Sequence, residues 1–289
     1  MVDSENHNLS GQWEEMSTRI AFIGGGNMAT SLVGGLIAAG TNPAAIIIAE
    51  PDMNKRAQLA QQFNIMTTDD NLATLQQDVV VLAVKPQLMQ TVCRQLSATE
   101  HVRQPLFVSI AAGIRSKDIT RWLGDNVAVV RCMPNTPALI RCGATALYAD
   151  DTVNAAQKQV ADEILRAAGI TAWVADEELL DVVTALSGSG PAYFFLLMEA
   201  MQQTAISMGL DADAAAKLTL QTALGAARMA TESDVDPEQL RARVTSRGGT
   251  TAAAISSFEH HDFHNNVSKA LHAAYNRSRE LANELGKDQ

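Results

Sequence analysis

Cysteine is scarce in this sequence of 289 residues, and the three that occur are Cys93, Cys132 and Cys142. Their number is odd and no two of them form a CxxC pair, so the sequence indicates neither a disulfide framework nor a zinc site. Because structural disulfides belong to oxidising compartments, this usage favours a reducing, cytoplasmic setting.

Long apolar runs and basic clusters are also lacking. No uninterrupted apolar run reaches the roughly 20 residues that a membrane helix needs, so we expect no membrane span. The formal net charge of −10 argues against a nucleic-acid partner or an anionic membrane surface, since both require clustered Lys and Arg. Residues 1–15 are polar and acidic and do not resemble a secretory signal; we expect them to form a disordered extension.

The chain does contain a regular alternation of short β-branched runs and helical patterns up to about residue 175. This alternation is typical of βαβ units, and the length favours two domains. We therefore expect a doubly wound Rossmann-type parallel sheet over residues 16–175. The expected strands are Arg19 to Ile23, Ile46 to Ala49, Val79 to Ala83, Leu106 to Ile110, Val127 to Cys132, Ala144 to Tyr148 and Thr171 to Val174.

After Asp176 the strand pattern stops, and segments rich in Ala, Leu and Met follow. We expect residues 176–289 to form an all-helical second domain, which ends in a helix over Asn265 to Leu285. The segment Tyr193 to Met201 is apolar nearly all round, so its helix must be buried on most sides. A domain of this size offers few such sides, and we expect a partner subunit to cover part of it.

A glycine-rich turn follows the first expected strand and leads into a helix. Its residues Gly24 to Ala29 read G-x-G-x-x-A. Gly24 permits the tight turn, Gly26 lets the backbone approach a pyrophosphate, and Ala29 allows close packing of helix on strand. The motif stands in the strand-turn-helix context that supports a dinucleotide-binding site.

The residues after the second expected strand bear on the choice between NADPH and NADH, and those after the third lie where this fold binds ligands. Glu50 could accept from the 2′-OH of an adenosine ribose, whereas Lys55 and Arg56 could bind a 2′-phosphate. The two signals conflict, and the basic pair is equally compatible with a solvated helix face, so both NADPH and NADH remain open. Val84, Lys85 and Pro86 end a strand at the carboxyl edge of the sheet, which faces ligands in this fold.

Four further segments resemble, in order, the motifs of the pyrroline-5-carboxylate reductases, and the likeness runs from about Arg19 to Leu285. The segments are Val84 to Gln87, Arg131 to Pro137, Ser187 to Tyr193 and Val244 to Thr251. The resemblance implies an N-terminal Rossmann domain, a helical dimerisation domain, and reduction of 1-pyrroline-5-carboxylate to L-proline by NADPH or NADH. It also implies a homo-oligomer, at least a dimer, with a ring of dimers as the larger assembly.

The resemblance assigns roles residue by residue. The turn before the helix over Ala252 to Glu259 offers hydroxyls and N–H groups that suit a carboxylate, and Thr251 is placed near the imine nitrogen. The expected substrate-binding residues are Ser187, Gly188, Ser246, Gly248, Gly249, Thr250 and Thr251. The expected coenzyme-binding residues are Gly24, Gly26, Asn27, Met28, Ala29, Glu50, Lys55, Arg56, Asn71, Ala83, Val84, Lys85, Pro86, Ala111, Gly113, Met133, Pro134 and Asn135.

One position departs from the family pattern, and one cluster invites a different reading. Arg247 stands where the family usually has proline, which frees the backbone of the turn and adds a positive charge. His260, His261 and His264 could suggest a metal, but the third ligand and the H-E-x-x-H pattern are missing, and we expect no metal site.

Two other functions remain open from the residues. A 3-hydroxyacid dehydrogenase of the same two-domain plan would need a general base, and Lys217 and Lys269 are the lysines within long helices of the second domain. Neither lysine has a matching motif around it. A non-catalytic dinucleotide-binding protein is the other alternative, and the complete loop from Ser246 to Thr251 argues against it.

Overall fold

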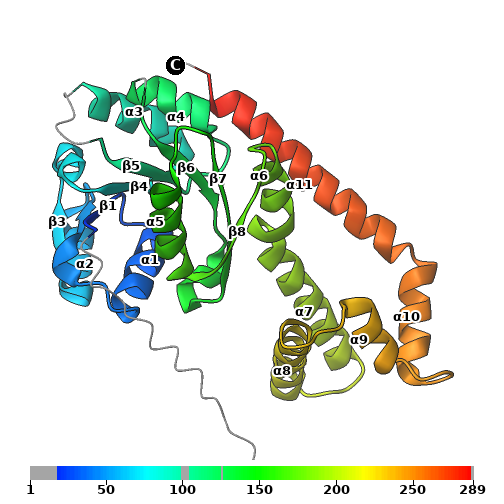
Figure 1. Ribbon diagram of the computed structural model, residues 1–289. Helices are drawn as coiled ribbons and strands as arrows, with labels where there is room; N and C mark the ends of the chain where they lie inside the picture. Colours follow the sequence, from blue (N-terminus) through cyan, green and yellow to red (C-terminus); the bar gives the residue numbers. More distant parts are fainter. Residues whose placement is uncertain (1–17, 99–103, 125, 288–289) are drawn as a thin grey trace, which may run out of the picture. The chain divides into compact units, whose positions relative to one another are not determined.

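The computed structural model describes residues 18–98, 104–124 and 126–287 (Figure 1). The predicted disordered extension therefore lies outside the described residues. By its contacts the chain divides into two compact units. One ends at Gly188 and takes up the chain again from Tyr275, and the other is Ser189–Ala274. The described residues from Tyr275 onward thus belong to the first of these units. The domain boundary expected between residues 175 and 176 stays a prediction.

The first unit is built on a single eight-stranded sheet of order β3-β2-β1-β4-β5-β6-β7-β8. Its strands are β1 (Ile20–Ile23), β2 (Ile46–Ala49), β3 (Met66–Thr68), β4 (Val79–Leu82), β5 (Leu106–Ser109), β6 (Val129–Met133), β7 (Gly143–Ala149) and β8 (Gly169–Trp173). All seven predicted strands are present within a few residues. The sequence analysis missed β3, which has three residues and no buried side chain to signal it.

The sheet departs from the wholly parallel arrangement at one pair of strands. β7 runs antiparallel to β6, with Arg131 opposite Tyr148, and β8 is parallel to β7. The connection from β6 to β7 covers only residues 134–142, which include the 3₁₀ helix η3 (Thr136–Ile140). A parallel pair needs a crossover of a dozen or more residues, so this short connection requires the antiparallel pairing.

Helices cover both faces of the sheet, as Figure 1 shows, and give two apolar cores. Helices α1 (Asn27–Ala38), α2 (Met53–Phe63) and α5 (Ala155–Arg166) pack on one face. Helices α3 (Pro86–Ser97) and α4 (Ser116–Leu123) pack on the other, together with Leu285 near the end of α11 (Phe263–Leu285). Except for β3 and β8, the strands are buried along most of their length, which explains their continuous apolar sequence. The predicted α/β fold of the N-terminal part is confirmed.

The second unit is entirely helical in its described residues, as predicted. It contains α7 (Gly190–Ser207), α8 (Ala212–Thr231), α9 (Pro237–Arg243), α10 (Thr250–His260) and the first half of α11. The first unit ends in α6 (Leu179–Val183) and a π-helical turn, η4 (Thr184–Gly188), which runs directly into α7. The glycines and the proline from Ser187 to Pro191 predict a tight turn, and this prediction is wrong because the helix continues through a widened π turn.

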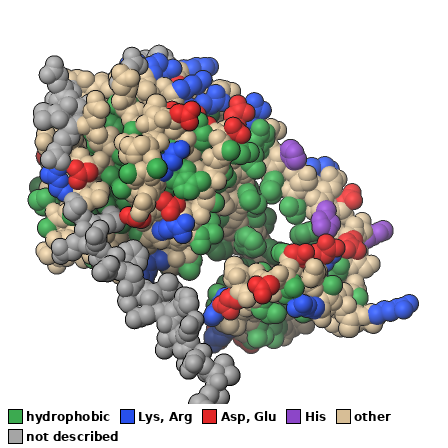
Figure 2. Space-filling model, in the orientation of Figure 1, with side chains coloured by type: hydrophobic (Ala, Val, Ile, Leu, Met, Phe, Trp, Pro, Cys, Tyr) green, Lys and Arg blue, Asp and Glu red, His purple; other side chains and the backbone are tan. Residues whose placement is uncertain are grey.

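The expected apolar helix leaves much of its surface open within one chain. Phe194, Phe195 and Leu196 of α7 are each more than 60% exposed. Figure 2 shows apolar side chains reaching the surface of this unit among the polar ones. By length and composition alone, Leu179–Ser207 would also suffice to cross a membrane. Polar residues interrupt this stretch, so no uninterrupted apolar run in the sequence signals it. An exposed apolar helix of this kind also suits an interface between subunits.

Close packing of α1 on the chain after α5 gives a test of the fold. A Cβ at Gly35 would lie 2.2 Å from the carbonyl oxygen of Ala167, whose backbone cannot move aside easily. We expect Gly35→Ala to lower the free energy of unfolding by about 1 to 3 kcal/mol through overpacking. Chemical denaturation of the full chain measures this effect.

The neighbouring Gly34→Ala is the matched control, since its Cβ would meet the ring of Phe63 at 3.3 Å, and a side chain can shift. Alanine is favoured over glycine inside a helix by about 1 kcal/mol, so equal or increased stability of Gly35→Ala would mean that α1 does not pack this closely.

Candidate functional site

The glycine turn after β1 has the geometry that a dinucleotide site needs. Gly24 adopts a φ of +95°, its N–H donates to the Ala49 carbonyl at 2.7 Å, and a Cβ there would lie 2.7 Å from the Ala83 carbonyl oxygen. Gly26 is the N-cap of α1 without a side-chain cap, and a Cβ there would meet nothing within 4 Å. The free N–H groups of α1 therefore lie beside open space, which fits a pyrophosphate. Ala29 is fully buried against the sheet.

The Glu50 carboxylate holds this turn from the end of β2. Its Oε2 accepts from the N–H of Gly25 at 2.9 Å and lies 3.2 Å from the Lys55 ammonium, and its Oε1 accepts from the N–H of Asp52 at 3.2 Å. Burial raises the pKa of this carboxyl, but the two backbone hydrogen bonds and Lys55 outweigh burial, so the pKa lies below its ordinary value. Glu50 is therefore an anion already engaged with the chain.

The Arg56 side chain is also held by contacts in this region. Its Nη1 donates to the carbonyl oxygens of Glu50 at 2.7 Å and Pro51 at 2.9 Å, and its Nη2 pairs with Asp69 at 3.4 Å. Lys55, in contrast, is about two-fifths exposed and has its ammonium on Glu50 alone among the described ion pairs. Of the two basic residues named from the sequence, Lys55 is thus the more available to a 2′-phosphate.

The carboxyl end of β4 lies beside the glycine turn, since Ile23 of β1 pairs with Leu82. Ala83 and Val84 are the residues that a Cβ at Gly24 would touch. Lys85 is exposed and is the N-cap of α3, and Pro86 begins that helix. Asn71 starts the 3₁₀ helix η2 (Asn71–Gln76), where its amide donates to Gln95 at 2.9 Å. The edge formed by β1, β2 and β4 brings together most of the expected coenzyme residues.

The loop after β5 has a partner that the sequence did not reveal. Gly113 adopts a φ of +72°, and a Cβ there would lie 3.5 Å from Leu281 and Leu285 of α11. Ala111 is buried in the core on the same face. The positive φ therefore favours glycine at this position, which lies in contact distance of α11.

Two expected site segments far apart in sequence meet in the first unit. The Asn135 amide donates to the Ser187 carbonyl at 3.0 Å and accepts from the Ala144 N–H at 2.9 Å. A Cβ at Gly188 would lie 2.5 Å from the terminal methyl of Met133. The Asn135 side chain therefore has a structural role. The absence of a side chain at Gly188 lets Met133 pack against the π turn. A π turn of this kind often marks a functional site.

The turn between α9 and α10 forms the other half of the expected site and belongs to the second unit. Gly248 adopts a φ of +73°, and the Gly249 N–H donates to the Ser246 carbonyl at 3.0 Å. A Cβ at Gly249 would lie 2.6 Å from Ser246 Oγ, so any other residue there would displace the Ser246 hydroxyl. Thr250 and Thr251 are the first residues of α10, whose N-terminus has no side-chain cap and no acidic residue in its first turn. The turn therefore offers hydroxyls and free N–H groups to an anion.

The described residues give little support for other catalytic chemistry. Burial raises the pKa of the Cys93 thiol to about 12 and also raises that of Cys132, so neither is an activated nucleophile. In the described ranges no three His, Cys, Asp or Glu side chains are grouped to hold a metal ion. Lys217, a candidate base of the dehydrogenase alternative, is exposed on α8 and pairs with Asp213 at 2.6 Å.

Comparisons with known proteins agree with this arrangement. Residues 177–281 match the family model for pyrroline-5-carboxylate reductase dimerisation, and residues 19–113 match that for NADP oxidoreductase, coenzyme F420-dependent. The pyrroline-5-carboxylate reductase of Pseudomonas aeruginosa is 54% identical over 94% of this chain and 100% of its own length. That of Haemophilus influenzae is 42% identical over 91% of this chain and 97% of its own.

Solved structures give the same result. A pyrroline-5-carboxylate reductase from Coxiella burnetii superposes with a TM-score of 0.88 at 45% identity, covering 92% of this chain and 98% of that one. The Plasmodium falciparum pyrroline carboxylate reductase with NADP bound has a TM-score of 0.81 at 27% identity, covering 93% and 99%. On this identity and coverage, the chain belongs to the pyrroline-5-carboxylate reductase family.

Proposed function

We infer that this protein reduces 1-pyrroline-5-carboxylate to L-proline with NADPH or NADH, the last step of proline biosynthesis. The observation that carries this inference is the 54% identity to a pyrroline-5-carboxylate reductase over that protein's entire length. Steady-state kinetics with 1-pyrroline-5-carboxylate and each coenzyme test it directly. Oxidation of coenzyme that depends on the imine is expected, and its absence with both coenzymes would refute the inference.

We propose that the turn at Gly24 to Ala29 and the N-terminus of α1 hold the pyrophosphate of the coenzyme. The open space at Gly26 and the uncapped helix end support this assignment. The bound nicotinamide supplies the hydride. Lys85, Ala111, Met133 and the other residues named from the sequence complete the proposed coenzyme set, in which Asn135 and Gly113 act by shaping the backbone.

We propose that the turn from Ser246 to Thr251 grips the carboxylate of the substrate. Its support is the combination of a φ-positive glycine, the close approach of Gly249 to the Ser246 hydroxyl, and the free N–H groups of α10. Arg247 is exposed in this turn and adds a positive charge near it. Holding the carboxylate orients the imine, and such positioning supplies much of the rate of a reaction between two bound molecules.

Thr251 is the residue that we assign to the imine nitrogen. Hydride transfer to the imine carbon leaves electron density on the nitrogen, which must hold or receive a proton. The Thr251 hydroxyl, in the first turn of α10, can donate or relay a hydrogen bond there. A protonated imine is already electrophilic, so no carboxylate or histidine base is required, in keeping with the scarcity of such groups around the turn.

We propose that α7 and its neighbours form the interface of a homodimer, and that dimers assemble further into a ring. The exposed Phe194, Phe195 and Leu196 support the dimer, as does the dimerisation model that spans residues 177–281. Light scattering at micromolar concentration should give a mass of at least two protomers, and a larger even multiple if the ring forms. A stable monomer would contradict both proposals.

The reducing, cytoplasmic location inferred from the three cysteines stays a proposal, as does the absence of nucleic-acid and membrane partners.

Coenzyme choice should respond to the charge of Glu50. Glu50→Gln keeps an oxygen for the Gly25 N–H, removes the charge that repels a 2′-phosphate, and frees Lys55. We expect kcat/KM for NADPH relative to NADH to rise by an amount equivalent to about 1 to 3 kcal/mol. Glu163→Gln, on the exposed side of α5, is the matched control. An unchanged ratio would show that Glu50 does not face the adenosine ribose.

The role of Thr251 can be separated from a simple helix cap. Thr251→Val keeps the shape and removes the hydroxyl, so kcat should fall about 10- to 1,000-fold while coenzyme affinity is retained. Single-turnover and steady-state kinetics give both quantities. If kcat is unaltered, the proton reaches the nitrogen from water or another group.

Ser246→Ala supplies the contrast. A contact to the carboxylate exists in the ground state and the transition state alike, so this variant should raise KM for the imine more than it lowers kcat. Collapse of the turn would instead impair both parameters in both variants.

A further inference from the structure

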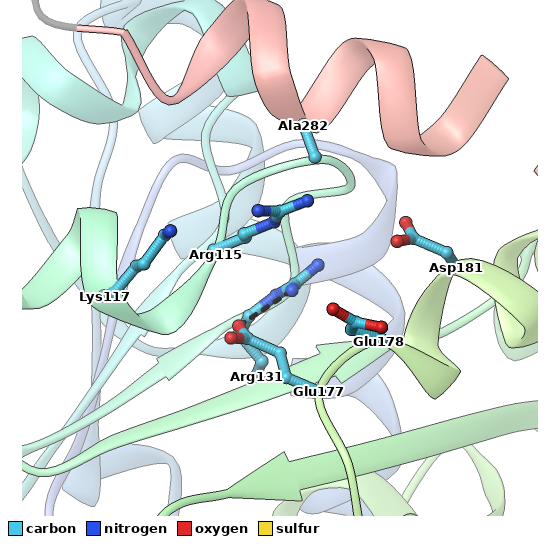
Figure 3. A pocket seen from close by; sticks show the side chains of 7 residues that line it. All are labelled: Arg115, Lys117, Arg131, Glu177, Glu178, Asp181 and Ala282. Carbon is cyan, nitrogen blue, oxygen red and sulfur yellow. Dashed lines mark hydrogen bonds and ion pairs between the residues drawn. The ribbon is translucent and has the colours of Figure 1, made fainter. Parts of the chain in front are cut away.

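A cavity of about 260 Å³ lies in the first unit and is lined by residues that have no role in the proposed reaction. They come from the start of α4, the middle of β6, the segment between β8 and α6, α6 itself, and the last turns of α11. Figure 3 shows them: Arg115, Lys117, Arg131, Glu177, Glu178, Asp181 and Ala282.

The charges around this cavity balance, and apart from the Arg131–Glu177 pair they lie on different sides of it (Figure 3). Arg115, Lys117 and Arg131 are basic, and Glu177, Glu178 and Asp181 are acidic, so the formal charges sum to zero. In Figure 3 the heads of the two arginines point toward the carboxylates of Glu178 and Asp181 across the open space. A cavity with one positive and one negative side favours a ligand that carries both charges over a simple anion or cation.

One ion pair builds the wall of the cavity. Glu177 Oε1 accepts from Arg131 Nη1 at 2.8 Å and from the backbone N–H of Ser116, the first residue of α4, at 2.6 Å. These bonds join the segment after β8 to both β6 and α4. Glu177 is thereby occupied, and it holds the Arg131 guanidinium in place.

Two buried charged groups lack a complete set of partners. The Arg131 side chain is only 8% exposed, and its Nε has no hydrogen-bond acceptor in the described part of the chain. Asp181 is 7% exposed and accepts from the Ser278 hydroxyl at 2.6 Å, but among the described ion pairs no cation meets it. A buried polar group without a partner is costly, so the Arg131 Nε favours a hydrogen-bond acceptor from a ligand, and the Asp181 carboxylate favours a cation.

The size of the cavity limits the ligand. A water molecule occupies roughly 30 Å³ of liquid, so a cavity of about 260 Å³ is large enough for a small organic molecule. We propose that the cavity binds a small zwitterion of the free amino-acid class. The ligand carboxylate lies toward Arg131 Nε and Arg115, and the ammonium group lies toward Asp181 and Glu178.

This inference does not depend on the reaction proposed above, although the product of that reaction, L-proline, belongs to the ligand class. L-Proline is therefore a suitable probe, titrated calorimetrically into the full chain. Cyclopentanecarboxylate and pyrrolidine have nearly the same shape and carry one charge each. We expect both to bind at least tenfold more weakly than L-proline, and equal binding of either analogue would overturn the zwitterion assignment.

Variants distinguish this cavity from the proposed substrate turn, where L-proline also binds as product. The side chains of Arg115 and Glu178 make no hydrogen bond or ion pair in the described part of the chain, and their backbone hydrogen bonds survive substitution. Arg115→Gln and Glu178→Gln should therefore leave the fold intact. Each should weaken L-proline binding to this cavity at least tenfold, whereas Ser246→Ala and the surface control Glu163→Gln should leave it unaltered.

If Ser246→Ala removes all binding while Arg115→Gln and Glu178→Gln remove none, the cavity does not bind the zwitterion. Binding that depends on Arg115 and Glu178 in a chain that fails to reduce the imine would support the cavity and refute the proposed function separately.

Discussion

The buried Glu50 carboxylate is the contact on which the coenzyme end of the protein depends. It accepts from the Gly25 N–H, so the glycine turn is held by a side chain from the neighbouring strand. A Cβ at Gly25 would lie 2.6 Å from the Cδ1 atom of Leu59 and 3.2 Å from Glu50 Oε2, so a larger residue would force both side chains to shift. The turn is therefore fixed before any ligand arrives, and a preorganised site loses less entropy on binding. The same carboxylate places a negative charge at the end of β2, which links the shape of the turn to coenzyme choice.

A second set of polar contacts ties the chain after β8 to the sheet. Asn135 bridges β7 and the carbonyl of Ser187, and Glu177 joins Arg131 to the start of α4. These groups are largely buried and hydrogen-bonded, so they specify one arrangement of the segment rather than merely adding stability. Close packing of Gly188 on Met133 completes this connection. The segment that leads into the helical unit is thus attached on both sides.

The proposed chemistry explains why the protein has few reactive side chains at the substrate turn. An imine that is already protonated needs orientation more than acid or base catalysis, and glycine backbone with two threonine hydroxyls can provide it. The charged cavity beneath α11 has no role in the proposed hydride transfer. Its three basic and three acidic residues come from the start of α4, from β6, from α6 and from the segment between β8 and α6. Their formal charges sum to zero, but not all of them form ion pairs. Such an arrangement is costly unless a ligand or another function uses it.

The sequence by itself determined the order of strands and helices, the glycine turn, the turn before α10 and the family. Each of these depends on signals within a short stretch of chain: apolar periodicity, glycines at positive φ, and residues that begin helices. β3 and the π turn were not predicted, because a three-residue strand and a widened helical turn have no distinct sequence pattern. The reversed direction of β7 was missed as well, although the connection after β6 is too short for a parallel crossover. Only the tertiary structure decided which acceptor holds Gly25, why Gly113 lies beneath α11, and where Arg131 and Asp181 remain incompletely paired. These contacts join residues far apart in the chain, so no local pattern predicts them. Burial makes an unpaired polar group costly, and a residue is buried only once the chain has folded.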